Sequence, residues 1–410
     1  MNAFSHIDQW IDDAAPAMVD LQSALVAIPA IAPDSGGDGE QPKAMMLKAR
    51  LEEMGLGPVE NYPAPDSRVS SGQRPNLFIR FPGRDTSHTT WIMAHTDIVP
   101  EGDRSKWTSD PFILRKEGDR LIGRGVEDNH QGLVAGIFAL KALREHSITP
   151  AHNIGCVFVA DEEFGSAFGI QYLLKKHPSL FGPKDLVLVP DSGDSTGAMI
   201  EIAEKSILWL KIITTGKQCH ASRPYNGKNA FAAASELIYH LQGLSQAFPQ
   251  TDPIFDPPTS TFQPTKKEAN IPNINTIPGE DVFYLDCRVM PGIPLDSVIA
   301  WIQSQADLVA DKHGVSIKLE PVQKEQAATP TPANCPLVKA LQSAIHQVHR
   351  VEAHPMGIGG GTVAAHFRRH GLHAAVWSTV DESAHQPNEY CLVQNMVKDT
   401  KVFARLLAML

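Results

Sequence analysis

The sequence predicts an α/β protein whose chain carries a second, smaller α+β domain as an insertion. Three short apolar segments with strand character each stop at an acidic or imidazole side chain, and amphipathic helical patterns lie between them. Further along, strand and helix patterns follow in a β-α-β-β-α-β-like order, which is typical of a small separate sandwich. We therefore expect a larger domain built from residues 1–206 and 327–410, and an inserted domain formed by residues 207–326.

The part of the chain before the insertion alternates between helical and strand patterns. Apolar residues recur at three- and four-residue steps, which predicts helices over 5–28, 41–54 and 133–145. Short apolar runs predict strands at 76–81, 89–94, 156–160 and 186–190. The first two of these strands are joined through Pro82-Gly83 and are expected to be neighbours.

The insertion and the final segment continue this alternation. In the insertion, strands are expected at 207–213, 281–288 and 315–322, and helices at 230–244 and 295–313. A proline-dense segment, 249–278, separates the first of these helices from the next strand. The larger domain then resumes with a helix at 337–348, a strand at 374–378 and a closing helix.

Composition restricts the classes of function. Of the 410 residues, 42% are hydrophobic and 20% charged, as in an ordinary globular protein. The 46 acidic and 36 basic side chains give a net charge of −10, which argues against a nucleic-acid surface. Five scattered cysteines without a CxxC pair indicate reduced thiols in a cytosol-like compartment. No apolar run approaches the roughly 20 residues of a membrane helix. Asp8, Asp12 and Asp13 interrupt any signal-peptide core, so we expect a cytoplasmic protein without a membrane partner.

The ends of the predicted strands carry the candidate site. The run that begins at Trp91 stops at His95, and Asp97 follows two residues later. Residues i and i+2 of an extended chain point to the same side, so a carboxylate could hold one nitrogen of a metal-binding imidazole. Taken alone, such a polar pair also fits a solvated strand end.

The same event recurs along the chain. The strand at 156–160 runs into Glu162 and Glu163, and the strand at 186–190 runs into Asp191. Because ligands of open α/β sheets bind at the carboxyl ends of the strands, these side chains could converge. Gathered carboxylates raise one another's pKa unless a divalent cation supplies opposing charge, which favours a metal site.

Two further candidate ligands lie in loops. Asp128 stands in a glycine-flanked loop that leads into the helix at 133–145, where a helix N-cap carboxylate is the alternative reading. His385 follows the last predicted strand and could instead be structural. Nitrogen and oxygen ligands of this kind suit zinc, and five of them suit two metals about 3.5–4 Å apart that share a carboxylate. The five are His95, Asp128, Glu163, Asp191 and His385. Glu162 is then left free to act as a general base.

Several motifs in one order resemble a known family, the dinuclear-zinc amidohydrolases. That family includes succinyl-diaminopimelate desuccinylase, acetylornithine deacetylase, aminoacylase, carboxypeptidase G and the carnosine-type dipeptidases. The resemblance covers nearly the whole chain. The motifs are His95-Thr-Asp97-x-Val-Pro100, Gly123-Arg-Gly125 with Asp128, Asp161-Glu162-Glu163, Asp191, His220-Ala-Ser-Arg-Pro-x-x-Gly-x-Asn-Ala230, Asp286-x-Arg288-x-x-Pro291 and His385.

The resemblance implies a zinc-peptidase-like three-layer catalytic domain and an inserted lid that also forms a homodimer. It implies that His95 and Asp191 hold one metal and that Glu163 and His385 hold the other, with Asp128 and a water between them. Zinc is the expected metal, although cobalt or manganese would also fit these ligands. The family also has a cis peptide bond after the residue that corresponds to Asp128.

The resemblance assigns roles to residues beside the metals. Asp97 would orient His95, and Glu162 would take a proton from the bridging water and give it to the leaving amine. His220 would stabilise the developing oxyanion in the partner's active site. Asn275 and Arg288 would contact the substrate, with Arg288 suited to a bidentate grip on a carboxylate.

The substrate class is less constrained. The lysine that usually follows the bridging aspartate in the family is absent from Asp128-Asn-His-Gln-Gly132. The family tends to have Asp at the position of Asp191 in dipeptidases and aminopeptidases, and Glu in deacylases and carboxypeptidases. We therefore expect a dipeptidase or exopeptidase, with an N-acyl-amino-acid deacylase as the alternative. A non-catalytic metal-stabilised binding protein is a more remote alternative, and it would be favoured by a missing ligand or base.

Overall fold

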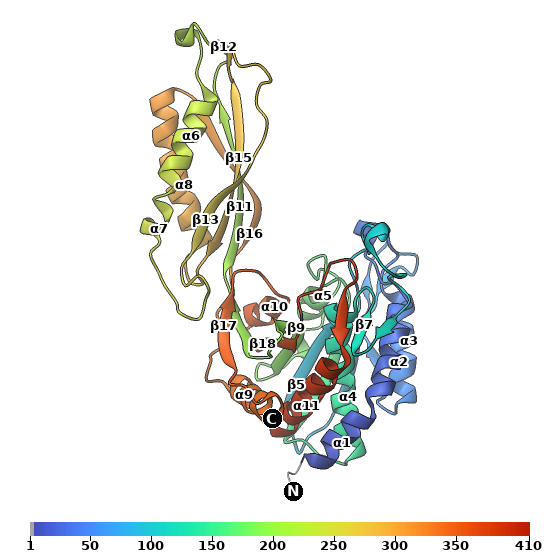
Figure 1. Cartoon of the computed structure of the whole chain (residues 1–410). Helices are drawn as coiled ribbons and strands as arrows, with labels where there is room; N and C mark the ends of the chain where they lie inside the picture. The colour runs from blue at the N-terminus through green and yellow to red at the C-terminus, as the bar shows by residue number, and fades with distance from the viewer. Residues whose placement is uncertain (1–3) are drawn as a thin grey trace. The chain divides into compact units, whose positions relative to one another are not determined.

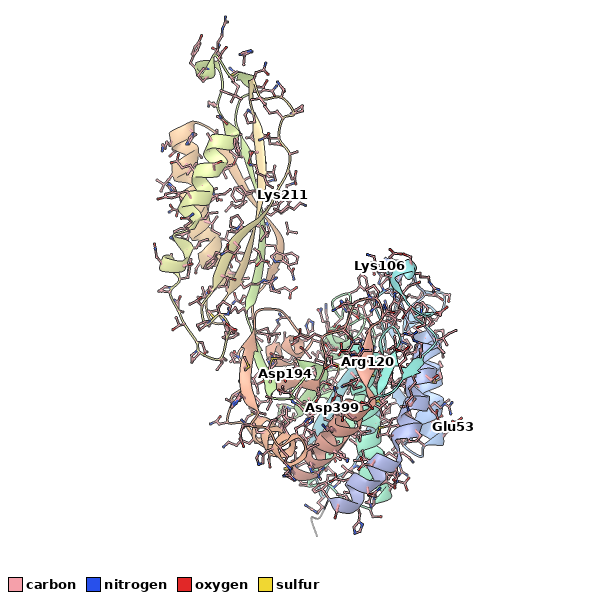
Figure 2. All side chains as sticks on the ribbon, viewed as in Figure 1. Glu53, Lys106, Arg120, Asp194, Lys211 and Asp399 are labelled. Atoms are coloured by element: carbon pink, nitrogen blue, oxygen red, sulfur yellow. The ribbon has the colours of Figure 1, made fainter. Side chains whose placement is uncertain are left out.

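The computed structural model describes residues 4–410, so the first three positions of the expected first domain segment lie outside the described residues. The chain divides into two compact units. The first unit runs to Ile202 and takes in Thr331–Met356 and Val363–Leu410. The second unit consists of Ala203–Pro330 and Gly357–Thr362. Figure 2 shows the side chains, with Asp194 labelled in the first unit and Lys211 in the second.

The first unit is built on an eight-stranded sheet. In order across the sheet, its strands are β1 (Glu60–Asn61), β4 (Leu77–Phe81), β8 (His152–Val159), β5 (Asp85–His95), β9 (Leu186–Asp194), β18 (His373–Thr379), β10 (Met199–Glu204) and β17 (His354–Ile358). The pairs β5 with β8, β5 with β9 and β9 with β18 are all parallel. The carboxyl ends of these four central strands therefore meet at one edge of the sheet.

The expectation that the strands at 76–81 and 89–94 are neighbours is wrong, because β8 lies between β4 and β5. The backbone N–H groups of Arg84 and Asp85 donate to the carbonyls of Pro150 and Ala151, just before β8. The short link through Pro82-Gly83 therefore runs beside the start of β8 and leaves room for that strand between β4 and β5.

Helices cover both faces of this sheet, as the residue alternation along β5 requires. Ile92 and Ala94 belong to the core under one set of helices, and Trp91 and Met93 to the core under the other. One layer contains α1 (Ser5–Asp13), α2 (Ala15–Val26), α3 (Gln41–Glu53), α4 (Gly132–Glu145), α9 (Pro336–His349) and α11 (Val393–Met409). The other contains α5 (Ile170–Lys176) and α10 (Ala364–Arg369). Helices α4 and α11 lie side by side (Figure 1). The three-layer α/β class predicted from the sequence is confirmed.

The second unit has an antiparallel four-stranded sheet in the order β13 (Thr261–Lys267), β15 (Glu280–Val289), β11 (Ser206–Thr215) and β16 (Ser316–Glu325). Helices α6 (Ala230–Leu241), α7 (Leu244–Ala247) and α8 (Leu295–His313) pack on one face through a core that includes Leu208 and Leu210. Strand β13 lies inside the proline-dense segment, for which we named no strand. It tolerates Pro264 because it is an edge strand and needs no donor on its outer side.

Short strands complete the structure. They are β2 (Ala64–Pro65) with β3 (Gln73–Arg74), β12 (Cys219–His220) with β14 (Thr276–Ile277), and a ribbon of β6 (Arg115–Glu117), β7 (Arg120–Ile122) and β19 (Tyr390–Leu392). Within residues 4–410, none of the helices combines the length and the apolar character needed to cross a bilayer.

Candidate metal centre

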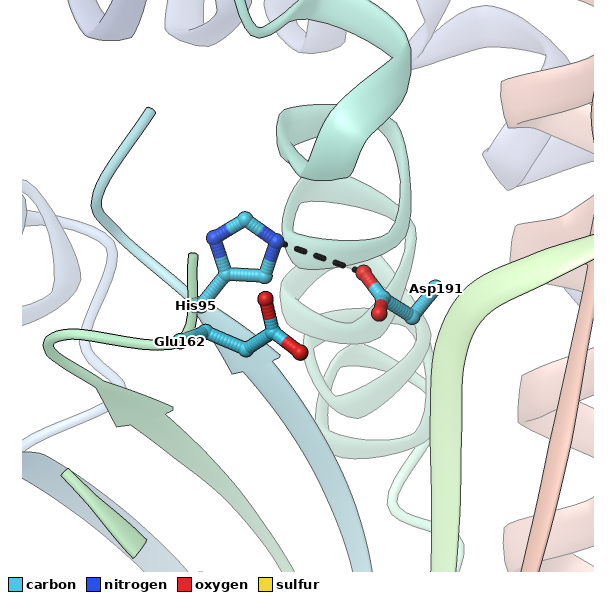
Figure 3. A group of neighbouring side chains, drawn as sticks. All are labelled: His95, Glu162 and Asp191. Atoms are coloured by element: carbon cyan, nitrogen blue, oxygen red, sulfur yellow. Dashed lines mark ion pairs between the residues drawn. The ribbon is translucent and has the colours of Figure 1, made fainter. Parts of the chain in front are cut away.

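The first half of the candidate site lies at the carboxyl ends of β5, β8 and β9. His95 is the last residue of β5, and Glu162 stands in the turn after β8. Strand β9 continues through Asp191 to Asp194, so Asp191 is part of a strand that is longer than expected. Its Oδ1 lies 3.3 Å from Nε2 of His95 (Figure 3). One ligand atom from each of His95, Glu162 and Asp191 lies within 4.8 Å of the others.

The second half shares a carboxylate with the first. Oδ1 of Asp128 lies 2.9 Å from Nε2 of His95, and its Oδ2 lies 3.0 Å from Nε2 of His385. The same nitrogen of His385 is 3.2 Å from Oε2 of Glu163. The five expected ligands therefore form one chain of contacts in which Asp128 stands between two imidazoles.

The loop before α4 aims Asp128 by its backbone. Gly125 has φ +84, and a Cβ there would meet Ile98 and His130, so only glycine fits. The peptide bond between Asp128 and Asn129 is cis, as the family resemblance implied. The side-chain carbonyl of Asn129 accepts the backbone N–H of His95 at 3.2 Å, and its –NH2 group donates to Oδ1 of Asp191 at 2.9 Å. Asn129 thus ties β5 to β9, a role that no spacing in the sequence revealed.

Charge and burial shift the pKa values of these groups strongly. Burial alone would lower the pKa of His95, but contacts with Asp128 and Asp191 raise it well above its usual value. Contacts with Asp128 and Glu163 raise the pKa of His385 to about 10. Burial, followed by the charge of Asp191, raises the pKa of Glu162 well above its ordinary range. The carboxylates thus draw both imidazoles toward the cationic form.

These residues fit a divalent metal pair. A metal ion competes with protons for such imidazoles, and it supplies the positive charge that the clustered carboxylates need. Oε1 of Glu163 is buried and has no hydrogen-bond partner among residues 4–410. Buried polar atoms are normally paired, so this oxygen is available as a ligand.

Asp97 organises the turn that carries Glu162 and Glu163. Its fully buried carboxylate accepts the backbone N–H groups of Glu162 and Glu163, each at 3.1 Å. Nδ1 of His95 lies 3.0 Å from the backbone carbonyl of Asp97 and 3.5 Å from its carboxylate. The closer partner of the imidazole is therefore the carbonyl, and the carboxylate serves the turn at Glu162.

A buried ionic layer that sequence reasoning missed lies behind Asp97. Arg74 binds Glu40 through two guanidinium nitrogens, and both side chains are fully buried. Lys43 is also fully buried, with Nζ 2.9 Å from Nε2 of His130. Burial lowers the pKa of Lys43 to about 7, against the opposing influence of Asp97.

The other three expected site residues lie in the second unit. His220 in β12 and Asn275 next to β14 are exposed on one two-stranded ribbon, in which the Asn275 carbonyl accepts the N–H of Ala221. Arg288 donates to both oxygens of Asp286, at 3.0 and 3.2 Å, and to the carbonyl of Gly359 at 3.0 Å. The guanidinium edge that would grip a substrate carboxylate is thus occupied by Asp286.

A three-layer α/β unit with imidazoles and carboxylates gathered at its strand ends is the arrangement expected of the metal-dependent hydrolases that the sequence motifs resemble. The family model described as peptidase family M20/M25/M40 matches residues 91–409, more than half of the chain, so the chain belongs to this family. The resemblance predicted from the sequence motifs is confirmed, and the protein is a metallohydrolase.

Individual proteins resemble almost the whole chain. An uncharacterized metallohydrolase of Methanococcus maripaludis is 39% identical over 95% of this chain and 98% of its own. A succinyl-diaminopimelate desuccinylase of Dinoroseobacter shibae is 28% identical, with 95% and 98% covered. The crystal structure of human carnosine dipeptidase 1 matches with a TM-score of 0.71 at 17% identity, covering 100% of this chain and 99% of that one. This structural match supports the zinc-peptidase-like fold.

Proposed function

We propose that the protein hydrolyses the amide bond of small, carboxylate-bearing dipeptides with the help of two divalent metal ions. Asp191 is the observation that carries the choice of substrate. It supplies the short carboxylate 3.3 Å from His95, at the position where the family tends to have Asp in its dipeptidases.

The contacts support a division of the ligands between two metals. His95 and Asp191 would hold one ion, Glu163 and His385 the other, and Asp128 both, because each of its oxygens faces a different imidazole. Zinc suits this mixture of nitrogen and oxygen ligands, and cobalt or manganese could replace it. When bound, such ions polarise the substrate carbonyl and make water more acidic.

Glu162 would act as the general base. Its carboxylate belongs to the group formed with His95 and Asp191, and burial raises its pKa well above its ordinary range. The turn held by Asp97 keeps this side chain in place. Glu162 would take the proton of the attacking water and deliver it to the leaving amine.

A deacylase is the second candidate, because one observation favours it. The desuccinylase from Dinoroseobacter shibae is similar over 95% of this chain, whereas the dipeptidase similarity at 17% identity reflects the fold. An N-acyl amino acid and a dipeptide present the same amide and carboxylate, so the same site could serve either.

The first experiment loads the protein with zinc or cobalt and measures the amines released from dipeptides and from N-succinyl and N-acetyl amino acids. Glu162→Ala should keep the fold and the metals but lose several orders of magnitude in turnover. Glu117→Ala, which alters an exposed glutamate, should match the unaltered protein. Turnover of N-acyl substrates alone would make the protein a deacylase, and normal turnover by Glu162→Ala would overturn the mechanism.

We further propose that the inserted segment, residues 207–326, forms a lid and dimerisation domain in a cytoplasmic homodimer. All five cysteines, which lie within residues 4–410, are free, which suits a reducing compartment. The exposure of His220 supports a role toward a partner subunit. If His220 acts across the dimer, mixing inactive His220→Ala subunits with inactive Glu162→Ala subunits should restore activity. Proven subunit exchange without rescue would refute this role.

A further inference from the structure

Two loops that carry metal-ligand candidates hold each other through buried carboxylates. The side chain of Glu127, next to Asp128, reaches the loop that leads to His385. It accepts the backbone N–H groups of Asp381, Ser383 and Ala384 at 2.6, 2.5 and 2.9 Å, and the Ser383 hydroxyl at 2.8 Å. Glu127 is only 5% exposed, so solvent competes little for these hydrogen bonds.

The second carboxylate acts in the opposite direction. Glu389, four residues after His385, is fully buried and accepts the backbone N–H groups of Gly125, Glu127 and Asp128 at 3.0 to 3.2 Å. Arg124 also donates to Glu389 at 2.6 Å. Each loop therefore supplies a carboxylate that organises the backbone of the other loop.

The loop around His385 needs such support. Glu382, His385 and Asn388 have φ values of +58, +63 and +62, a left-handed region that non-glycine residues adopt at a cost. Three such residues within seven positions persist only where surrounding contacts fix the backbone. The donors that Glu127 binds lie at 381, 383 and 384, immediately before His385.

Glu127 is not a further metal ligand in this arrangement. Both of its oxygens already accept hydrogen bonds, Oε1 from Asp381 and Oε2 from Ser383 and Ala384. Its effect on the centre must pass through the backbone that presents His385 to Asp128 and Glu163.

We propose that Glu127 is a positioning residue that fixes the His385 loop relative to Asp128 and thereby builds the second metal site. This inference rests on the proposed function, since it assumes that His385 and Glu163 bind a metal. The substitution Glu127→Gln keeps the shape of the side chain but turns an –NH2 group toward backbone N–H donors. Glu382→Gln is the matched control, because it makes the same change on an exposed side chain of the same loop.

Two measurements test the proposal without using activity. In zinc titrations against a chelator, Glu127→Gln should keep one equivalent at unaltered affinity and bind the second roughly 10- to 100-fold more weakly. In the metal-free protein, amide hydrogen exchange at residues 381–385 should be faster in Glu127→Gln and unchanged in β5 and β8. His385→Ala should weaken the second metal, and Glu382→Gln should change neither quantity.

Two outcomes would overturn the proposal. One is wild-type affinity for both metals in Glu127→Gln, and the other is unchanged exchange at 381–385. If Glu127→Gln does not fold, Glu127→Asp keeps the charge but shortens the reach to the backbone N–H groups of Asp381, Ser383 and Ala384. It should shift both quantities in the same direction, and no shift would count against Glu127. Should the unaltered protein bind no second zinc ion, the proposed function fails, while the exchange of the metal-free loop still reports on Glu127.

Discussion

Replacing Asp97 with asparagine tests whether its carboxylate holds the acidic turn. Asparagine keeps the shape and one acceptor, but its –NH2 group faces one of the two backbone N–H groups, those of Glu162 and Glu163, that Asp97 now accepts at 3.1 Å. Asp97 is fully buried, so water cannot replace the lost partner. Leaving one buried donor unpaired costs about 1–3 kcal/mol.

The charge of Asp97 acts on its neighbours in both directions. It raises the pKa of the Glu40 and Glu163 carboxyls, but it also raises the pKa of Lys43 and Arg74, whose cations it attracts. Burial alone would raise the pKa of Asp97, but its contacts lower it, so its surroundings favour the charged form and removing the charge brings no net relief. We therefore expect Asp97→Asn to lower the free energy of unfolding by about 1–3 kcal/mol, the cost of an unpaired buried donor.

The assay is a urea titration of the metal-free protein, which separates this effect from metal binding. Asp103→Asn is the matched control, because the exposed Asp103 also accepts a backbone N–H, that of Ser105 at 3.0 Å. In the control, water can pair with the exposed N–H of Ser105, so the free energy of unfolding should change by no more than about 0.5 kcal/mol. Equal stabilities for Asp97→Asn and the control would refute the reasoning.

Two further predictions concern buried charges in the first unit. Burial lowers the pKa of His349 to about 4, from an ordinary value of 6.5. The imidazole of His349 takes up a proton near pH 6.5 in the unfolded chain but only near pH 4 in the folded protein. The contribution of neutral His349 to the free energy of unfolding is therefore complete above pH 6.5 and is lost as the pH falls toward 4. The thermal midpoint of His349→Leu should therefore vary less over that range than that of the unaltered protein, and an identical pH profile would contradict this. Glu40→Leu should lower the free energy of unfolding, measured with urea, by about 3 kcal/mol, because it removes the main partner of the buried Arg74. A Glu40→Leu variant as stable as the unaltered protein would show that the unpaired arginine carries no such penalty.

The convergence of four of the five candidate ligands could be predicted because each of the four leaves a local signal. His95, Glu163 and Asp191 follow apolar strand patterns, and Asp128 follows a glycine whose backbone only glycine adopts. Parallel strands then bring these positions to one edge of the sheet without any long-range knowledge of the chain.

The residues that hold the backbone beside these candidate ligands leave no such signal. Glu127 and Glu389 act through hydrogen bonds to the backbone of a loop more than 250 residues away, and such contacts do not depend on spacing. Lys43 is different, because it precedes Leu47 and Leu51 at four-residue steps and so lies on the buried face of α3. A charged residue on that face was a readable sign of a buried polar partner.

Sheet neighbours were also less predictable than the strands themselves. Sequence proximity favoured pairing β4 with β5, but a later strand was inserted between them. Strand β13 could not be predicted because it contains Pro264. A proline argues against a strand unless the strand is known to lie at a sheet edge.

The position of β18 in the sheet has a consequence for folding during synthesis on the ribosome. This strand, formed by His373–Thr379, lies between β9 and β10, although both of those strands are synthesised more than 160 residues earlier. Until it emerges, a nascent chain exposes two open strand edges, which are templates for aggregation. His385 arrives later still, so the centre cannot take its final form before nearly the whole chain has been translated. We expect cells to treat a prematurely terminated chain as a misfolded product, and not as a less active enzyme.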